Sequence, residues 1–453
     1  MTTRAEQLST MQERLWFLWQ LDPSATHYNI TFGWRVTGRK TPAVAQAART
    51  LLTRHRVLRG AYRSDEQGTP QRVTLRPDEV PVRYLALTGD DDRAARTVQE
   101  LVTEMHRTPF DLDKGSARCL IAEEPGGTTS VVWTCHHIAV DAWSIGVLRD
   151  ELCTLLDGEA TGLPDQPAQY EDFVAWEEDV RRGPDAASAV SRRARIATAT
   201  RPTTPWPRLP GPGPSATAAG EAHAVIDGAG FQALSRLAAT EGVTLYGLGL
   251  AACAVALAEW CAASEVTVGA NIAKRAFPGG ESVVGMLVDP LVLRLAVHRG
   301  APLRRTVQDV WDHFLDLVEH SDAPHVDVLR AAADMGADTR GPLFDVIVTC
   351  SEEEVTVQHG AVRLDPLPAP APTTVKFGLS VEFVTSPGRL RLHVIHPDSG
   401  QEAAQVARFV DRLTGVLRAM AAEGLDTPVP PPPVPRRPVG RFAGLLDTPT
   451  PRP

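Results

Sequence analysis

Two adjacent histidines, His136 and His137, open the segment HHIAVDAWS, which begins where a hydrophobic strand pattern ends and continues into a helical pattern. Histidine is the side chain whose ordinary pKa suits proton transfer near neutral pH. Consecutive strand residues point to opposite faces, so only one of the two histidines can face a given cleft. A helix that begins at this junction directs N–H groups toward incoming negative charge. The segment therefore predicts acid–base catalysis by one histidine, and two structural histidines are the alternative that these residues leave open.

Three neighbours of the histidines carry groups that bear on this chemistry. Asp141 has two interpretations: it orients His137, or it caps the helix expected from Ala142, which is the commoner role for such an aspartate. Ser144 is either a hydroxyl donor or an ordinary residue of the first helical turn. Cys135 is a candidate thiol nucleophile, but a cysteine inside an apolar strand is more often inert core.

The bulk composition is that of an ordinary globular protein, with 43% hydrophobic and 22% charged residues in a chain of 453. This length favours two or three compact units. The longest apolar run, Leu245 to Leu257, is too short to span a bilayer, and the N-terminus lacks a signal-peptide pattern, so we expect a cytoplasmic protein without a membrane partner. The net charge of −9 argues against nucleic acid as a partner. The six cysteines show no metal-binding spacing, and the sequence predicts neither a metal site nor a cofactor bound by this chain.

The elements that must position the histidines form two α/β halves. In the first, helical patterns occur at 8–18, 42–58, 91–107 and 142–156, and strand patterns at 26–36, 71–75, 80–87, 118–122 and 130–135. In the second, helices are expected within 231–260, 307–333 and 401–423, and strands at 223–226, 265–272, 283–297, 343–349 and 376–383. Residues 202–220 have the composition of a linker, and the proline-dense residues 427–453 cannot form a core. We therefore predict an N-terminal subdomain at 1–180, a linker region at 181–220, a C-terminal subdomain at 221–426 and a disordered tail at 427–453.

Seven segments, in order along the chain, resemble the motifs of the condensation-domain superfamily of nonribosomal peptide synthetases and related acyltransferases. His136 to Ser144 resembles the HHxxxDG signature of that family. The other segments are LSTMQERLWFL (8–18) followed by YNI (28–30), RHRVLR (54–59), YEDFVAW (170–176), VVGMLVDPLVLR (283–294), RGPLF (340–344) and TVKFGLSVEF (374–383). On this ordered set, which covers residues 8 to 423, the chain is identified as a member of that superfamily.

The resemblance implies an α/β (α+β) fold of two chloramphenicol-acetyltransferase-like subdomains, arranged as a V-shaped pseudodimer with a central tunnel. His137 carries over as the catalytic residue, which accepts a proton from the attacking amine or hydroxyl or holds the nucleophile in line. His136 and Asp141 carry over as structural supports of the site, with Asp141 paired to Arg294.

The sequence departs from the family pattern at several positions. Ala142 stands where the family has a glycine whose backbone N–H is thought to help stabilise the oxyanion, and alanine keeps that N–H. Because φ at a helix start is usually negative, we expect the alanine to be tolerated and to narrow the tunnel. Ser144 is the other group near the oxyanion position. Arg56 replaces an acid, Asp289 an asparagine and Gly378 an aspartate, and the last two bear on substrate size and docking more than on catalysis.

The function that the resemblance implies is acyl or aminoacyl transfer from a carrier-protein phosphopantetheine thioester to an amine or hydroxyl acceptor, giving an amide or ester in natural-product biosynthesis. Since the motifs begin at Leu8 and end before the proline-rich tail, we expect a free-standing enzyme that meets an acyl- or peptidyl-carrier protein in trans. Its acceptor is either a free small molecule or carrier-bound. Heterocycle formation is not expected, because cyclising relatives have an aspartate in place of the first histidine.

Two alternatives to this function stay open. One is a polyketide-associated O-acyltransferase, which would use the same histidine on an alcohol. The other is a non-catalytic recruitment module for a carrier or another partner. Such modules usually lose the second histidine or the aspartate of the motif, and both His137 and Asp141 are present here.

One dense basic cluster stands out in a chain that is acidic overall. It is a candidate docking face for an acidic carrier protein, where charge mainly sets the encounter rate and the orientation. A solvated helix surface is the alternative. The cluster comprises Arg181, Arg182, Arg192, Arg193, Arg195 and Arg201.

Overall fold

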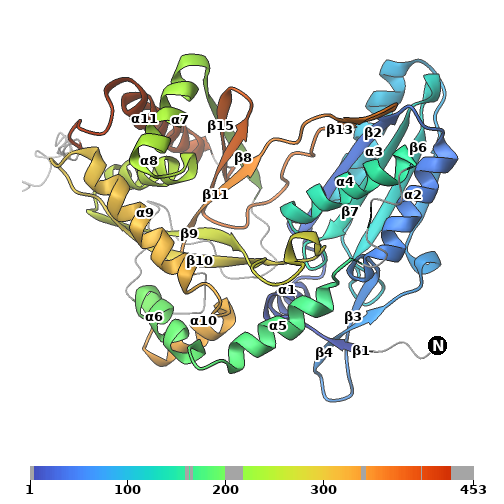
Figure 1. Ribbon diagram of the computed structural model, residues 1–453, viewed down its shortest axis with the longest axis horizontal. Helices are drawn as coiled ribbons and strands as arrows, with labels where there is room; N and C mark the ends of the chain where they lie inside the picture. The colour runs from blue at the N-terminus through green and yellow to red at the C-terminus, as the bar shows by residue number, and fades with distance from the viewer. Residues whose placement is uncertain are drawn as a thin grey trace, which may run out of the picture.

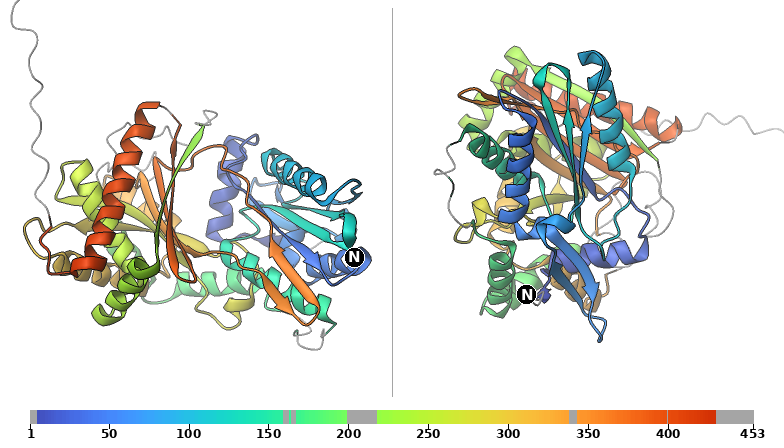
Figure 2. Two further views of the ribbon diagram at one scale, coloured as in Figure 1. Left: turned by 90° about the horizontal axis from the view of Figure 1, so that it is seen from above. Right: turned by 90° about the vertical axis from the view of Figure 1, so that its right-hand side faces the viewer.

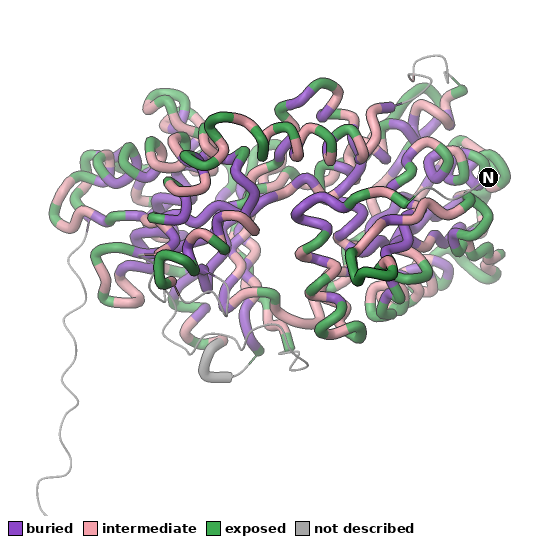
Figure 3. The backbone as a smooth tube through the Cα atoms, turned by 90° about the horizontal axis from the view of Figure 1, so that it is seen from below, coloured by how far each residue is buried: buried purple, intermediate pink, exposed green. Residues whose placement is uncertain are grey.

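The computed structural model describes residues 5–158, 163, 167–198, 218–337, 343–398 and 400–429. It contains two α/β halves that lie side by side, called here the N-half and the C-half (Figure 1). Buried residues gather in two main zones, one within each half (Figure 3).

The N-half is built around a strand whose residues are all buried, Thr129–His136 (β7). Val98 and Val102 of α3 pack against one face of its sheet, and α2 and α4 cover the other. Two covered faces explain the nearly continuous apolar sequence of β7. The elements of the first part of the chain are β1 (Ala5–Gln7), α1 (Thr10–Leu21), β2 (Asn29–Thr37), α2 (Thr41–Arg54), β3 (Gly60–Ser64), β4 (Pro70–Thr74), β5 (Val82–Ala86), α3 (Asp91–Arg107), β6 (Ala117–Glu123), β7, α4 (Ala142–Asp157), α5 (Tyr170–Arg182) and α6 (Ala186–Thr198), the last of which packs on the C-half.

The C-half has a six-stranded sheet in the order β10-β9-β11-β14-β15-β8. The helices α7, α8 and α11 pack on one face of it, the face turned away from the N-half (Figure 2). The elements of the second part of the chain are β8 (Ala219–Asp227), α7 (Gly228–Glu241), α8 (Leu245–Trp260), β9 (Glu265–Ala273), β10 (Val288–Ala296), α9 (Leu303–Glu319), α10 (His325–Asp334), β11 (Val346–Glu352), β12 (Val357–His359), β13 (Val362–Pro366), β14 (Leu379–Ser386), β15 (Arg389–Pro397) and α11 (Gly400–Glu423).

Two segments from the second part of the chain join the N-half. The strands β12 and β13 extend its sheet, which has the order β12-β13-β2-β7-β6-β5, because β13 pairs with β2. Residues 274–287, called here the bridging loop, place Phe277, Val283 and Leu287 in the N-half core. Residues 367–378, called here the crossing segment, lead from β13 back to β14 in the C-half. The predicted cut between residues 180 and 221 therefore does not separate the two packing units.

Most predicted elements occur, and the differences have local causes. The helix predicted at 8–18 begins at Thr10, because Ser9 caps it and forms a capping box with Gln12. The run predicted as one strand at 283–297 is strand only from Val288, since its first residues belong to the bridging loop. The helix predicted at 307–333 is two helices, with Pro324 as the N-cap of α10.

Where it is described, the predicted linker region contains the end of α5, the helix α6, which packs against α10, and the start of β8. Residues 199–217 lie outside the described residues, and so does the tail from residue 430. At the start of the predicted tail, Pro428 forms a bridge with Pro302 and Val429 is buried. Within the described residues, no single helix is both long and apolar enough to cross a membrane; α7 and α8 meet the criteria only as a pair bent by 100°.

Candidate active site

His137 lies just beyond the end of β7 and is the more accessible of the two histidines. Its backbone N–H donates to the carbonyl of Tyr28 at 2.8 Å. Its ring Nδ1 lies 2.8 Å from the carbonyl oxygen of Val140. A carbonyl oxygen only accepts, so Nδ1 carries the proton and Nε2 keeps a free lone pair. The side chain is partly exposed, whereas the following residues 138–141 are buried.

His136 points the other way and is only 2% exposed. Its Nδ1 accepts the N–H of Ile138 at 3.2 Å. Its ring lies between Tyr28 and Phe110, at centroid distances of 5.9 and 6.2 Å. The opposite orientation expected for neighbouring strand residues is therefore present, and His136 is part of the packing beneath the site.

Both histidines are neutral at physiological pH. Burial lowers the pKa of His137 to about 4, and the positive charge of Lys376 adds to this effect. Burial also lowers the pKa of His136 to about 3. A neutral His137 with its lone pair on Nε2 is a base that is ready to accept a proton.

Lys376 is a residue of this site to which the sequence analysis gave no role. It lies on the crossing segment, with Nζ 5.1 Å from the centroid of the Tyr28 ring. Burial lowers its pKa to about 8, yet its side chain retains accessible surface. Both observations fit a side chain that is surrounded by protein atoms but still reaches solvent. No carboxylate forms an ion pair with it among the described residues.

One sequence signal pointed to Lys376. It is the only charged residue between Asp365 and Glu382, in a stretch otherwise made of apolar residues, prolines, threonines, serine and glycine. A lone charged residue in such a stretch is a candidate for a position that is enclosed by protein.

Asp141 is completely buried and holds the bridging loop to the N-half. Its carboxylate accepts two hydrogen bonds from the guanidinium of Arg275, at 2.8 and 2.9 Å. It also accepts the N–H of Leu287 at 3.2 Å and caps α4 by accepting the N–H of Ser144 at 2.8 Å. Of the two roles weighed from the sequence, Asp141 fills that of helix cap. The printed hydrogen bond of the His137 ring goes to Val140 and not to Asp141, so among the described contacts Asp141 does not orient His137.

The predicted pairing of Asp141 with Arg294 is wrong. Arg294 pairs with the exposed Glu265, at 2.6 Å. The antiparallel register of β9 and β10 gives the reason, because Val288 faces Ala273 next to the bridging loop, whereas Arg294 lies six residues farther along β10. That separation is roughly 20 Å along a strand. The arginine that reaches Asp141 is Arg275, directly after β9.

The start of α4 is open at Ala142. The residue is exposed and is not among those with positive φ, so the backbone conformation expected for it is confirmed. Ser144 is buried instead. Its hydroxyl donates to Asp141 at 2.6 Å and accepts the N–H of Gly285 at 3.0 Å. Ser144 therefore joins α4 to the bridging loop and does not point an oxyanion donor into open space.

The helices α1 and α5 fix the histidine segment and the bridging loop in place. Gln12 donates to the carbonyl of Ile138 at 3.0 Å. The hydroxyl of Tyr170 donates to the carbonyl of Met286 at 2.8 Å and lies 2.7 Å from the hydroxyl of Ser9. These contacts give a physical reason for the first motif and for YEDFVAW, neither of which supplies a reacting group.

Gly285 is required where the bridging loop passes Tyr170, because a Cβ at this position would lie 1.9 Å from the ring. We expect Gly285→Ala to lower the free energy of unfolding by about 1–3 kcal/mol, through overpacking, and to slow turnover. Gly146→Ala is the matched control, since a Cβ on that helical glycine meets no atom within 4 Å. Urea unfolding midpoints compare the two variants, and equal midpoints would contradict the tight seating of the loop.

Cys135 is buried, and burial raises the pKa of its thiol to about 12. A thiol with this pKa is protonated at neutral pH and is a poor nucleophile. The interpretation of Cys135 as inert core is therefore confirmed.

The basic cluster is largely neutralised. Arg193 is buried, lies 3.5 Å from Asp289, and donates to the backbone carbonyl of Pro290 at 3.0 Å. It stabilises packing and is unavailable for docking. Of the others, Arg181 pairs with Asp327, Arg182 with Glu178 and Arg192 with Asp316, Arg195 is exposed, and Arg201 lies outside the described residues.

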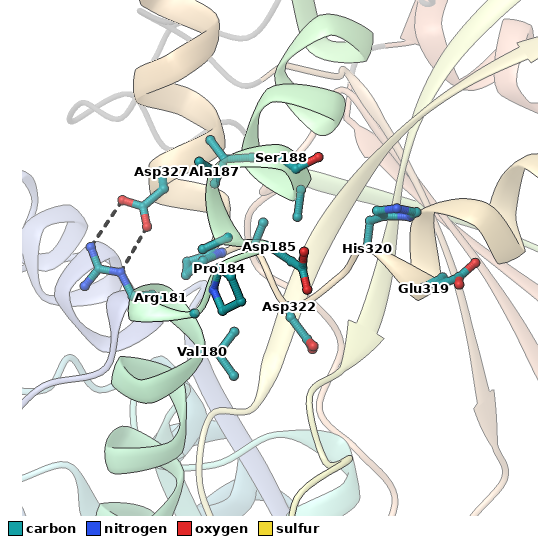
Figure 4. A pocket seen from close by; sticks show the side chains of 16 residues that line it. Val180, Arg181, Pro184, Asp185, Ala187, Ser188, Glu319, His320, Asp322 and Asp327 are labelled. Atoms are coloured by element: carbon teal, nitrogen blue, oxygen red, sulfur yellow. Dashed lines mark hydrogen bonds and ion pairs between the residues drawn. The ribbon is translucent and has the colours of Figure 1, made fainter.

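A cavity of about 640 Å³ lies away from the histidines, between the α5–α6 turn and residues 319–327. Figure 4 shows the Arg181–Asp327 ion pair on one side of it and Asp185, Asp322 and His320 on the other. None of the residues of the histidine segment lines this cavity.

Comparison with known proteins adds to this geometry. The Condensation domain family matches residues 3–429. The chain is 29% identical over 434 residues to phosphinothricin tripeptide synthetase PhsC of Streptomyces viridochromogenes, covering 92% of this chain and 39% of that protein. It is 30% identical over 428 residues to tyrocidine synthase 3 of Brevibacillus parabrevis, covering 92% of this chain and 6% of that protein. The chain thus spans well under half the length of these curated relatives.

Solved structures have the same fold. The first condensation domain of the calcium-dependent antibiotic synthetase matches with a TM-score of 0.77 and 22% identity, over 95% of this chain and 98% of the other. The condensation domain of the monacolin K polyketide synthase MokA matches with a TM-score of 0.80 and 15% identity, over 94% and 99%. The predicted fold of two acetyltransferase-like halves is confirmed. With the match over residues 3–429, the chain belongs to the Condensation domain family.

Proposed function

We propose that this chain transfers an acyl or aminoacyl group from a carrier-protein phosphopantetheine thioester to an amine or hydroxyl acceptor, with Nε2 of His137 as the base. The observation that carries the proposal is the locked ring of His137, whose Nδ1–H donates to Val140 and whose Nε2 is left free on a partly exposed side chain. The relatives are peptide synthetases, which favours an amine acceptor and an amide product.

In the proposed reaction, the acceptor nitrogen attacks the thioester carbonyl while His137 Nε2 takes up its proton. The C–N bond forms, the C–S bond then breaks, and the proton passes to the departing thiolate. The exposed N–H of Ala142 at the start of α4 is the proposed donor to the transient oxyanion, where the positive end of the helix also favours negative charge.

The thioester arm would come from a carrier protein outside residues 3–429, because the condensation fold accounts for that whole segment. We propose that the carrier approaches in trans and that the arm and the acceptor reach His137 through a tunnel between the halves. The accessible surface of Lys376 and His137 between the halves supports such a space.

Intact-protein mass spectrometry tests the function directly. Acyl-loaded carrier proteins are incubated with the chain and with amine or alcohol acceptors, and the loss of the acyl mass from the carrier is followed together with the product. Acyl loss that requires both the chain and an acceptor supports the proposal, and the product mass distinguishes amide from ester. A carrier that binds the chain but keeps its acyl group across the whole panel would instead favour the recruitment module.

The pH dependence of transfer tests the role assigned to Lys376. Its ammonium disfavours protonation of His137, so Lys376→Met should raise the pKa of His137 from about 4 toward its ordinary value near 6.5. The acid limb of the single-turnover rate then moves to higher pH, by about one pH unit. Lys40→Met, at an exposed lysine outside the site, is the control. An acid limb that stays at the same pH in Lys376→Met would contradict this electrostatic role.

A further inference from the structure

A second group of chemically capable side chains lies on the open face of the C-half sheet, outside the histidine segment. It comprises Glu221 and His223 on β8 and His393 on β15. One ligand atom from each of the three residues lies within 4.8 Å of the others. The helices α7, α8 and α11 cover the opposite face, so this group is turned toward the N-half (Figure 2).

The strand register brings these residues together. His393 is the direct cross-strand partner of His223, and Glu221 is two residues before His223 on the same face of β8. The two imidazole rings stack at a centroid distance of 4.8 Å with 12° between their planes. Nε2 of His393 lies 2.7 Å from the carboxylate of Glu221.

The third strand supplies a carboxylate behind His393. Glu382 on β14 lies 3.5 Å from Nδ1 of His393, and it accepts a hydrogen bond from Ser351 at 2.8 Å. The hydrogen bond to Glu382 raises the pKa of His393, whereas burial and the neighbouring His393 lower the pKa of His223. Arg391 is the other charged group that acts on this cluster. The cluster thus combines two carboxylates with two imidazoles.

We propose that Glu221, His223 and His393 bind one divalent transition-metal ion, with Zn²⁺ as the best fit. Two imidazoles and one carboxylate form a typical zinc ligand set and leave a fourth position open for water or a substrate group. The metal takes the place of the proton on Nε2 of His393. Nδ1–H of the same ring then donates to Glu382, in the carboxylate–histidine–metal arrangement that orients metal-bound histidines.

One consequence follows from the placement of this metal site. Because β8 is the edge strand of the sheet, the metal would fasten it to β15 and stabilise the folded chain by mass action. This consequence does not depend on the proposed acyl transfer.

The sequence predicted no metal site, because His393 joins Glu221 and His223 only through the strand order. The pattern Glu-x-His at 221–223 did indicate two of the three proposed ligands, because residues two apart on a strand lie on the same face.

Titration calorimetry of chelator-treated full-length chain with Zn²⁺ alone tests the site, and Co²⁺ absorption reports the coordination. We expect one Zn²⁺ per chain, a higher melting temperature with Zn²⁺, and affinity losses of roughly tenfold or more in His223→Ala and Glu221→Gln. Both replacements are at exposed positions, so the variants should fold. His298→Ala is the matched control, since His298 also bonds a carboxylate, Asp309, at 2.5 Å but is not in the cluster.

Two results would overturn the proposal. One is the absence of a one-to-one Zn²⁺ binding event in the wild-type chain. The other is a Zn²⁺ affinity of His223→Ala and Glu221→Gln that equals that of His298→Ala.

Discussion

Replacing His137 by alanine is expected to slow acyl transfer by about 10²- to 10⁴-fold, the usual contribution of a positioned acid–base group. The physical reason is the loss of a neutral ring whose Nδ1–H is held by Val140 and whose Nε2 is left free on a partly exposed residue. Among the described residues, the side chain makes one hydrogen bond, to Val140, so its removal should cost the fold only about 1 kcal/mol. The measurement is a single-turnover rate with an acyl-loaded carrier, together with the melting temperature of each variant.

His27→Ala is the matched control for this prediction. Burial and Lys376 lower the pKa of His27 to about 4, as they do for His137, but no backbone carbonyl holds its ring among the described contacts. We expect its rate to stay within tenfold of wild type. Equal rate losses in the two variants, or full activity in His137→Ala with an intact fold, would show that His137 is not the base.

Breaking the Asp141–Arg275 pair is expected to have the largest effect on stability. Both side chains are buried, and removal of one partner from a buried pair typically costs about 3–5 kcal/mol, because the other charge is left without compensation. Arg275→Ala should therefore lower the urea midpoint strongly. It should also slow transfer, because the bridging loop loses its main attachment to the histidine segment.

Arg294→Ala is the control that distinguishes the two arginines. Arg294 pairs with Glu265 where both side chains are about a third or more exposed, and such pairs contribute at most about 1 kcal/mol. A double-mutant cycle between Asp141 and Arg275 gives the coupling free energy of the pair. A larger loss of stability in Arg294→Ala than in Arg275→Ala would contradict the arrangement described here.

The sequence predicted the fold and the position of the histidine site well, for physical reasons. The sequence signal around residues 130–156 is strong because β7, which is covered on both faces, is a nearly continuous apolar run and α4 buries one face against its neighbours. The ordered motifs mark segments that touch one another in the structure, such as α1, α5 and the histidine segment. Opposite orientations of His136 and His137 followed from strand geometry alone.

The predictions that failed concern contacts between segments that are far apart in the sequence and are brought together by the path of a loop. The partner of Asp141 is decided by the path of the bridging loop, and no local pattern distinguishes Arg275 from Arg294. Lys376 reaches Tyr28 only because β13 joins the N-half sheet and the chain must cross back to β14. The sequence suggests that the six arginines of the basic cluster share one surface. In the structure, however, Arg193 is buried and pairs with the buried Asp289.

The protonation state of Nε2 of His137 decides whether the site can act as described, and ¹⁵N NMR of histidine-labelled protein reads that state directly. The spectrum of His137→Ala assigns the resonances. At pH 7 we expect Nδ1 protonated and Nε2 unprotonated, with the ring titrating near pH 4, as its burial and the charge of Lys376 require. A ring that is doubly protonated at pH 7, or that carries its single proton on Nε2, would contradict the assignment of His137 as the base.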